Sequence, residues 1–283
     1  MSIDQLNLKI KQYYLSHDEW PLNRRTFKKF DEWIESKYSE GVKESYFFEK
    51  LEFAGIELRN KNVLEVGCGL GGLIVMFAKK GYKVTGIDID SQAIEIARLR
   101  AKVRGVDSLC SFGISREYEI PFPSNYFDCI LCFSVLEHVK YPEKLIDEMD
   151  RVLKKGGFIF IQTPNANKFY EPHFKSFWLP RMPKYLAKIF FRLRGFRNSS
   201  FIYHLNYMYP SKLYKLLRNS NYEICDLQLE NKIKRIENFH SENGLKKFTF
   251  RLLDLVGMNK NEKIIKLFRI IFRSTELIAI KKY

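Results

Sequence analysis

The sequence lacks any long apolar run. None of its 283 residues falls in an uncharged apolar stretch of about 18 residues, the length that a membrane-spanning helix needs. The N-terminal stretch MSIDQLNLKIKQYYLSHDEW contains no apolar core of signal-peptide length. These absences predict a cytoplasmic protein without a spanning helix. With 46% hydrophobic and 29% charged residues, the composition also excludes an intrinsically disordered chain.

Cysteine is scarce, and its five copies lie in apolar or glycine-rich surroundings, as reduced thiols do. We therefore expect no disulfides. Cys129 and Cys132 form a CxxC inside FDCILCFS, a segment typical of a strand. Three residues apart on a strand, they point to opposite faces, whereas a metal or redox pair needs converging sulfurs. The sequence therefore predicts no metal site.

Acidic residues are fewer than basic ones, 33 against 48, and the resulting charge of +15 is unevenly distributed. Residues 1–60 hold 10 Lys/Arg against 11 Asp/Glu, and residues 61–165 hold 14 against 13. Residues 166–283 hold 24 against 9, so the whole excess lies there. Such a region suits an anionic surface or substrate, although a basic face that only keeps the protein in solution has the same composition.

The middle of the chain alternates between strand and helix patterns. The expected strands are VLEV (63–66), YKVTGIDID (82–90), SLCSFGI (108–114), a segment within NYFDCILCFSVLEHV (125–139), and FIFIQTPN (158–165). The expected helices are GLGGLIVMFAKKG (69–81), QAIEIARLRAKVRG (92–105) with Ser91 as its N-cap, and YPEKLIDEMDRVLKKGG (141–157). This alternation predicts βαβ units in a doubly wound α/β domain, with a ligand beyond the carboxyl ends of the strands.

A glycine-rich turn follows the first expected strand. Its glycines are Gly67, Gly69, Gly71 and Gly72. They allow backbone N–H groups and a helix N-terminus to approach a ligand closely. Asp88 ends the next strand, where a carboxylate can accept both hydroxyl protons of a ribose. A purely structural turn would leave this pairing unexplained.

Several motifs together resemble class I S-adenosylmethionine-dependent methyltransferases, in particular the branch with quinone-type and other small-molecule acceptors. The motifs are VLEVGCGLGG, GIDID, PFPSNYFDCILCFSVLEHV and KLIDEMDRVLKKGGFIFIQTPN. Residues 209–228 and 274–283 resemble the family's later helix, sixth strand and closing strand. Glu65 before GCG favours this family over nicotinamide dehydrogenases.

The resemblance implies a Rossmann-like methyltransferase fold with a seven-stranded, mostly parallel sheet. Residues 61–165 would form the core that binds S-adenosylmethionine. Residues 1–60 would form a helical cover. Residues 166–283 would supply an acceptor lid, the last strands and basic helical insertions of the same domain.

The resemblance also implies a set of cofactor-binding residues. They are Glu65, Gly67, Cys68, Gly69, Asp88, Ile89, Ile114, Ser115 and Phe133. The backbone of residues 67–69 would face the methionine part of the cofactor, and Phe133 would lie near the same end. Asp88 would bind the ribose and Ile89 would pack on the adenine. Many relatives have an acidic residue near Ile114 and Ser115, so Ser115 would hold the adenine amino group more weakly.

Methyl transfer from a sulfonium is an in-line displacement, so the protein mainly aligns the acceptor with the methyl group. A hydroxyl acceptor must also lose a proton, a task that suits histidine. His138, in LEHV after the fourth strand, is the expected catalytic residue, as a base or as a group that orients the acceptor. Alternatively, Glu137 and His138 only brace this loop.

His173 follows the fifth strand in FYEPHFKSFWLP. Its aromatic neighbours Phe174, Phe177 and Trp178 either wall an acceptor pocket or belong to an ordinary core.

Two basic stretches, PRMPKYLAKIFFRLRGFR (180–197) and NEKIIKLFRIIFRS (261–274), have the pattern of amphipathic helices. Such helices can lie on an anionic membrane surface, or pack their apolar face on the sheet or on a second subunit. Aromatic residues beside the cations would permit RNA stacking, but no recognised nucleic-acid module accompanies them.

The first 60 residues are expected to form three helices over the cofactor cleft, with Trp20, Trp33 and Tyr46 near the acceptor. The sequence thus predicts transfer of a methyl group to an oxygen atom of a small or lipid-linked metabolite, such as a quinone precursor or a saccharide. The alternative is a non-catalytic protein that binds S-adenosylmethionine or RNA and acts through its basic C-terminal surface. Peripheral contact with the inner face of a membrane is compatible with either, and the oligomeric state stays open.

Overall fold

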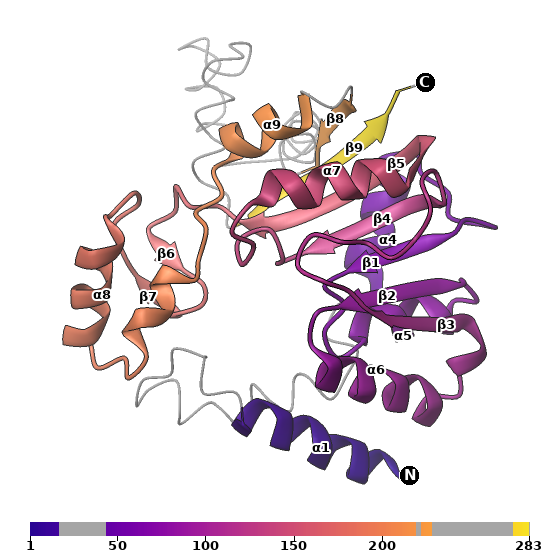
Figure 1. The fold of residues 1–283 in the computed structure, drawn as a ribbon, viewed down its shortest axis with the longest axis horizontal. Helices are drawn as coiled ribbons and strands as arrows, with labels where there is room; N and C mark the ends of the chain where they lie inside the picture. Colours follow the sequence, from indigo (N-terminus) through magenta and orange to yellow (C-terminus); the bar gives the residue numbers. More distant parts are fainter. Residues whose placement is uncertain (17–43, 219–221, 228–273, 283) are drawn as a thin grey trace, which may run out of the picture.

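The computed structural model contains a seven-stranded sheet with helices on both faces (Figure 1). It describes residues 1–16, 44–218, 222–227 and 274–282. The strands are β1 (Val63–Val66), β2 (Val84–Asp88), β3 (Cys110–Ile114), β4 (Phe127–Phe133), β5 (Leu153–Pro164), β8 (Tyr222–Asp226) and β9 (Ser274–Lys281). Their order is β3-β2-β1-β4-β5-β9-β8, and β9 is antiparallel to both of its neighbours. The predicted doubly wound, mostly parallel sheet is therefore confirmed.

The central strands are buried on both faces, which explains their nearly continuous apolar sequences. On β4, Cys129 packs in the cluster that contains Phe77, whereas Cys132 packs in the cluster that contains Met149. The two thiols thus face opposite sides of the sheet, as predicted, and neither can meet the other at a metal ion.

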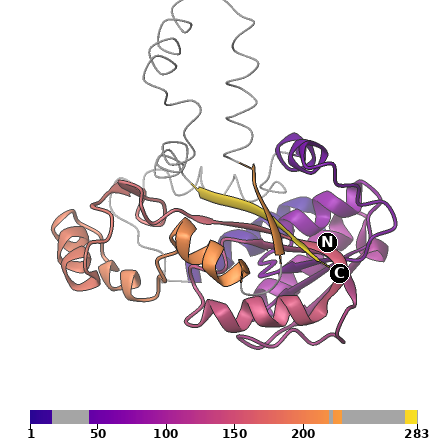
Figure 2. The same ribbon diagram turned by 90° about the horizontal axis from the view of Figure 1, so that it is seen from above.

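Two groups of helices cover the two faces of the sheet (Figure 2). One face carries α4 (Glu44–Phe53), α5 (Gly72–Lys79) and α6 (Ser91–Val103), and the other carries α7 (Pro142–Val152) and α9 (Pro210–Arg218). Helix α6 begins one residue earlier than expected, because its N-cap is Asp90 and not Ser91. The Asp90 carboxylate accepts hydrogen bonds from the backbone N–H groups of Gln92 and Ala93.

The boundary between α7 and β5 differs from the prediction. The lysines and glycines at 154–157 were expected to end the helix, but α7 ends at Val152 and β5 begins at Leu153. Leu153 is fully buried and pairs with Phe127 on β4, which holds its backbone extended. The register then shifts before the next pair, Cys129 with Phe158, and Gly156 adopts a φ of 73° within this irregular segment.

The N-terminal helices contact different parts of the core. Helix α1 (Ile3–Ser16) packs on α6 through Leu6 and Ile10. Helix α4 instead packs on the sheet, where the Phe47 ring lies 5.0 Å from that of Phe160, so it does not lie over the strand ends. The expected helix at 24–38, together with Trp20, Trp33 and the side chain of Tyr46, lies outside the described residues.

Between β5 and α9 the chain forms a small unit beyond the ends of the strands, at the left of Figure 1. It contains the hairpin of β6 (Tyr170–Glu171) and β7 (Ser176–Phe177), helix α8 (Lys184–Leu193) and the 3-10 helix η2 (Ser199–Tyr203). Phe174 and Trp178 are buried in its own apolar cluster with Phe191. These two aromatic residues are therefore core residues of the unit, whereas Phe177 is exposed.

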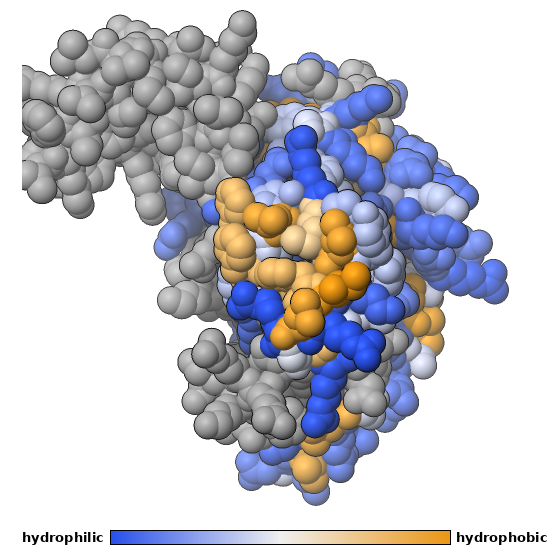
Figure 3. Space-filling view, turned by 90° about the vertical axis from the view of Figure 1, so that its left-hand side faces the viewer, coloured by the Kyte–Doolittle hydropathy of each residue, from blue (hydrophilic) through white to orange (hydrophobic). Residues whose placement is uncertain are grey.

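The outer face of this unit is apolar. Figure 3 shows, on the side that carries α8, an apolar patch surrounded by hydrophilic residues. Ile189 and Leu193 of α8 are 53% and 83% exposed, and Leu186 and Tyr185 are exposed beside them. The second basic stretch, 261–273, lies outside the described residues. Among the described helices, none has the length and apolar character needed to cross a bilayer.

Candidate functional site

A cavity of about 310 Å³ opens at the carboxyl ends of β1 and β2, next to the turn after β4. It lies where the strand order reverses between β1 and β4, the usual ligand position in a doubly wound sheet. Four of the residues predicted to bind the cofactor line it: Gly67, Asp88, Ile89 and Ser115. Its size is within the range of small-molecule sites.

The turn after β1, at the floor of this cavity, has a backbone conformation and packing that require glycine. Gly67, Gly69 and Gly71 have φ values of 71°, 48° and 72°, in the left-handed region. A Cβ on Gly67 would lie 2.4 Å from Cγ2 of Val135, whereas a Cβ on Gly69 would meet no atom within 4 Å. The turn therefore packs tightly against the loop after β4 and leaves the backbone at Gly69 open to a ligand.

Asp88 is held by this turn. Its Oδ2 accepts a 2.7 Å hydrogen bond from the Gly69 N–H, and its Oδ1 accepts one of 3.0 Å from the Asp90 N–H. Burial raises the pKa of Asp88 above its ordinary value, although these backbone donors oppose the shift. The carboxylate keeps further lone pairs for the vicinal hydroxyls of a ribose.

The other predicted cofactor residues surround the cavity without lining it. Glu65 and Cys68 are buried beneath the turn, and burial, followed by the charge of Asp88, raises the pKa of Glu65 well above its usual range. Ile114 is exposed at the end of β3. Phe133 does not face the cavity, contrary to expectation, because its ring packs on the opposite side of β4, 5.5 Å from Phe47.

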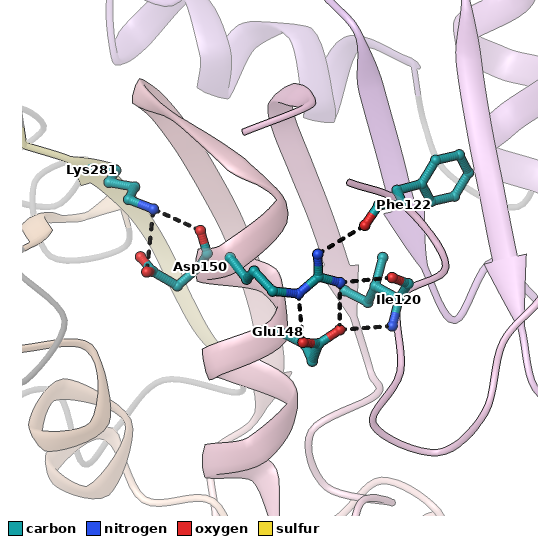
Figure 4. Close-up of polar contacts among 6 residues, drawn as sticks. Ile120, Phe122, Glu148, Asp150 and Lys281 are labelled. Carbon is teal, nitrogen blue, oxygen red and sulfur yellow. Dashed lines mark hydrogen bonds and ion pairs between the residues drawn. The ribbon is translucent and has the colours of Figure 1, made fainter. Parts of the chain in front are cut away.

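The sequence did not indicate the wall formed by the loop after β3. Arg116, Glu117, Glu119 and Ile120 line the cavity from this loop. Figure 4 shows why the loop lies there. The Arg151 guanidinium on α7 donates to the carbonyl oxygens of Ile120 (2.9 Å) and Phe122 (2.8 Å).

Glu148 completes this anchor. It accepts two hydrogen bonds of 2.7 Å from Arg151 and one of 3.1 Å from the Ile120 N–H. On the same helix, Asp150 forms an ion pair with Lys281 of β9, which ties α7 to the sheet. The loop is thus fixed by side chains far along the sequence, which local patterns did not indicate.

His138 lies at the mouth of the cavity, with one side exposed. The inner side of its ring faces His173 at a centroid distance of 5.1 Å and an interplanar angle of 88°. Desolvation of that side, followed by the charge of His173, lowers the pKa of His138 to about 4.

Glu137, and not His138, braces the loop after β4. The Glu137 carboxylate is buried and accepts a 2.9 Å hydrogen bond from the Thr163 hydroxyl, while its backbone carbonyl accepts from the Asn206 N–H. Burial is the main cause that raises the pKa of Glu137 to about 7. Of this pair, Glu137 therefore braces the loop, whereas His138 lines the cavity.

His173 approaches this pair from the β6–β7 turn. Its Nδ1 lies 2.8 Å from Oε1 of Glu171, whose Oε2 accepts from the Phe174 N–H. Burial alone would lower the pKa of His173, but the hydrogen bond to Glu171 and the charges of Glu171 and Glu137 raise it. The site thus combines a cavity bordered by Asp88 and the glycine turn with a cluster of imidazoles and carboxylates at its mouth.

Comparison with known proteins is consistent with this geometry. The model of a family described as a methyltransferase domain matches residues 38–227. A ubiquinone biosynthesis O-methyltransferase of Paracidovorax citrulli is 36% identical over 110 residues, which are 39% of this chain and 46% of that protein. A norajmaline N-methyltransferase of Rauvolfia serpentina is 34% identical over 146 residues, 50% of this chain and 49% of that protein. The chain spans about half the length of these curated relatives.

Two solved structures share the fold. Phosphoethanolamine N-methyltransferase 2 of Haemonchus contortus, in complex with S-adenosylmethionine, superposes with a TM-score of 0.54 and 19% identity, covering 87% of this chain and 54% of that one. The YcgJ protein of Bacillus subtilis gives a TM-score of 0.51 and 20% identity, covering 79% of this chain and 92% of that one.

Proposed function

Because the chain belongs to the class I S-adenosylmethionine-dependent methyltransferases, we propose that it transfers the methyl group of this cofactor to an oxygen atom of a small or lipid-linked acceptor. One observation carries the proposal. The cavity that Asp88 and the glycine turn form on one side is bordered by His138 on the other, so a bound cofactor and an acceptor would meet there. The fold, the enzyme class and the cofactor are those of the family.

The residues present fit this cofactor. We assign the ribose hydroxyls to Asp88, the methionine portion to the backbone of residues 67–69, and the adenine to Ile89 and Ser115. The open space above Gly69 lets the cofactor approach the backbone closely. Ser115 takes the place of an acidic residue, so we expect a weaker contact with the adenine amino group.

Methyl transfer mainly requires that the acceptor oxygen is aligned with the methyl group of the cofactor. The acceptor oxygen attacks the methyl carbon, and the electron pair of the carbon–sulfur bond moves to sulfur, leaving S-adenosylhomocysteine. His138 is the residue best placed to meet the acceptor, by taking its proton or by a hydrogen bond that orients it. A His138→Ala protein is expected to bind the cofactor normally and to lose turnover.

Oxygen is the proposed acceptor atom because ubiquinone biosynthesis O-methyltransferases of several bacteria are 36–38% identical to this chain over 110 residues. The match to norajmaline N-methyltransferase makes nitrogen the competing choice. The test is incubation with methyl-labelled S-adenosylmethionine and matched catechol, sugar and amine acceptors, with products identified by mass spectrometry. Label on hydroxyl oxygen supports the proposal, and label on amines alone overturns it. Cofactor binding without turnover on any acceptor would favour a non-catalytic binder.

For the acceptor's location, we propose peripheral contact with an anionic membrane through α8. The apolar patch on this helix lies next to Lys188 and Arg192, and cations beside apolar side chains suit an anionic lipid surface. Co-sedimentation with anionic and with neutral vesicles tests this contact. We expect Leu193→Glu to release the protein from anionic vesicles, and Leu8→Glu on α1, also an exposed apolar position, to leave binding unchanged. Equal recovery with both kinds of vesicle would contradict the proposal.

A further inference from the structure

Three side chains suited to bind a metal ion meet at the mouth of the cavity. Glu137 and His138 follow β4, and His173 comes from the β6–β7 turn. Their ligand atoms, one from each residue, all lie within 4.8 Å of one another. The CxxC motif, which the sequence analysis considered for metal binding, is not involved.

The buried carboxylate of Glu137 has an oxygen available. Its Oε2 accepts the hydrogen bond from Thr163, but its Oε1 has no hydrogen-bond partner among the described residues. A buried carboxylate oxygen without a partner is costly, and such groups are rare in folded proteins. A cation at Oε1 would remove this cost.

Glu171 prepares His173 for the same ion. Because Glu171 Oε1 lies 2.8 Å from Nδ1 of His173, that nitrogen is used as the donor and Nε2 is left as the ligand atom. The Phe174 N–H fixes the other oxygen of Glu171. A carboxylate that orients a histidine in this way is the usual outer partner of a metal-binding imidazole.

The size of the space and the types of donor atom limit which ion can bind. A cavity of about 20 Å³ borders Glu137, Glu171 and His173, enough for one water molecule or ion. Two imidazoles and one carboxylate suit Zn²⁺ and its transition-metal neighbours, whereas Mg²⁺ and Ca²⁺ prefer oxygen ligands. Donors bound to one Zn²⁺ lie about 3.4 Å apart. The three ligand atoms, within 4.8 Å of one another, would close to that separation around a bound ion.

We propose that Glu137, His138 and His173 bind a divalent transition-metal ion, with Zn²⁺ as the best fit. Three protein ligands would leave a coordination position open for an acceptor in the cofactor cavity, which His138 lines. This role rests on the proposed function. An acceptor hydroxyl at the open position loses its proton to water more readily, and its oxygen then attacks the methyl carbon. His138 then acts through the ion and does not take the proton itself.

The test measures metal binding without cofactor or acceptor, so that it does not depend on methyl transfer. Metal-free full-length protein is titrated with Co²⁺, and the visible absorption of bound Co²⁺ is followed, with Zn²⁺ as competitor. We expect one Co²⁺ per chain, displaced by Zn²⁺. His173→Ala and Glu137→Gln should weaken binding about 100-fold or more, and Glu171→Gln, which removes only the orienting charge, about 10- to 100-fold. His204→Ala, at an exposed histidine outside the cluster, is the matched control and should bind as the wild type does.

Circular dichroism and cofactor binding show that each variant is folded. Wild-type protein that binds Co²⁺ no more tightly than His173→Ala, or a Co²⁺ spectrum unchanged in all three variants, overturns the inference. Tight metal binding without turnover on any acceptor would contradict the proposed function and leave the metal site standing. Full turnover by metal-free protein that binds no Co²⁺ would overturn the metal site and leave the proposed function standing.

Discussion

The backbone N–H of Gly69 donates a 2.7 Å hydrogen bond to Oδ2 of Asp88. This contact joins the turn after β1 to the end of β2, so the two elements that form the cofactor cavity position each other. The same carboxylate lines the cavity. Asp88 therefore has a structural role, and its proposed ligand-binding role is tested by substitution.

We expect Asp88→Asn to weaken binding of S-adenosylmethionine about 10- to 100-fold, because it removes charge-assisted hydrogen bonds worth roughly 1.5–3 kcal/mol. The Asn side chain keeps one acceptor oxygen for two backbone donors, the N–H groups of Gly69 and Asp90, so a modest fall in the melting temperature is expected as well. Isothermal titration calorimetry measures the affinity. Asp90→Asn is the control, since Asn is also a good N-cap and should preserve α6. Unchanged affinity of the Asp88 variant would remove this residue from the cofactor site.

Gly67→Ala should destabilise the fold more than Gly81→Ala. Both glycines have left-handed φ values, 71° and 85°, which cost an alanine about 1–2 kcal/mol. At Gly67 the added Cβ would also lie 2.4 Å from Val135, and overpacking adds about 1–3 kcal/mol, whereas Gly81 has no atom within 4 Å. Urea unfolding compares the two. Equal losses would show that the Val135 contact relaxes freely, and adding Val135→Ala to Gly67→Ala should recover part of the difference.

Local patterns predicted most of the fold. Glycines and apolar runs marked β1, β2 and the helices between them, and Asp88 was identified by its position at a strand end. The end of α7 was missed because Lys154, Lys155 and the following glycines have the pattern of a helix C-terminus. There the pairing of buried Leu153 with Phe127, a tertiary contact, outweighs the local signal.

The mouth of the site could not be predicted in the same way. His138 was selected because it lies in the loop after β4, but its neighbour His173 reaches it only through the packing of the β6–β7 unit. The predicted position of the Phe133 side chain was wrong because successive side chains along a strand point to opposite faces of the sheet. The position of a residue along the chain relative to a strand end is thus predictable, whereas the direction of its side chain and the contacts made by an insertion are not.

Arg151→Met should loosen the loop that forms one wall of the cavity. The substitution leaves the carbonyl oxygens of Ile120 and Phe122 and the Glu148 carboxylate without this donor. Because Arg151 is partly exposed, we expect a loss of about 1–3 kcal/mol in the free energy of unfolding, and weaker cofactor binding. Lys9→Met, which breaks the exposed 3.8 Å pair with Glu95, should cost less than about 0.5 kcal/mol. Equal effects of the two variants would contradict the anchoring role.

The same anchor should make stability depend on pH in the acidic range. The side-chain hydrogen bond from Arg151 is the main cause that lowers the pKa of Glu148 below its ordinary value of 4.5, and burial only partly opposes it. A carboxyl with a lowered pKa in the folded state contributes stability above its unfolded pKa and loses it as the pH falls through the folded value.

Wild type should therefore exceed Glu148→Gln in stability by a constant amount above about pH 6, and this difference should shrink as the pH falls below the ordinary value of 4.5. Urea unfolding of both proteins across this range measures it. Glu95→Gln, which alters only the exposed pair with Lys9, should show almost no such difference. A difference between wild type and Glu148→Gln that stays constant down to pH 3 would mean that Glu148 stabilises the loop by its shape and its backbone contact to Ile120, and not by its charge.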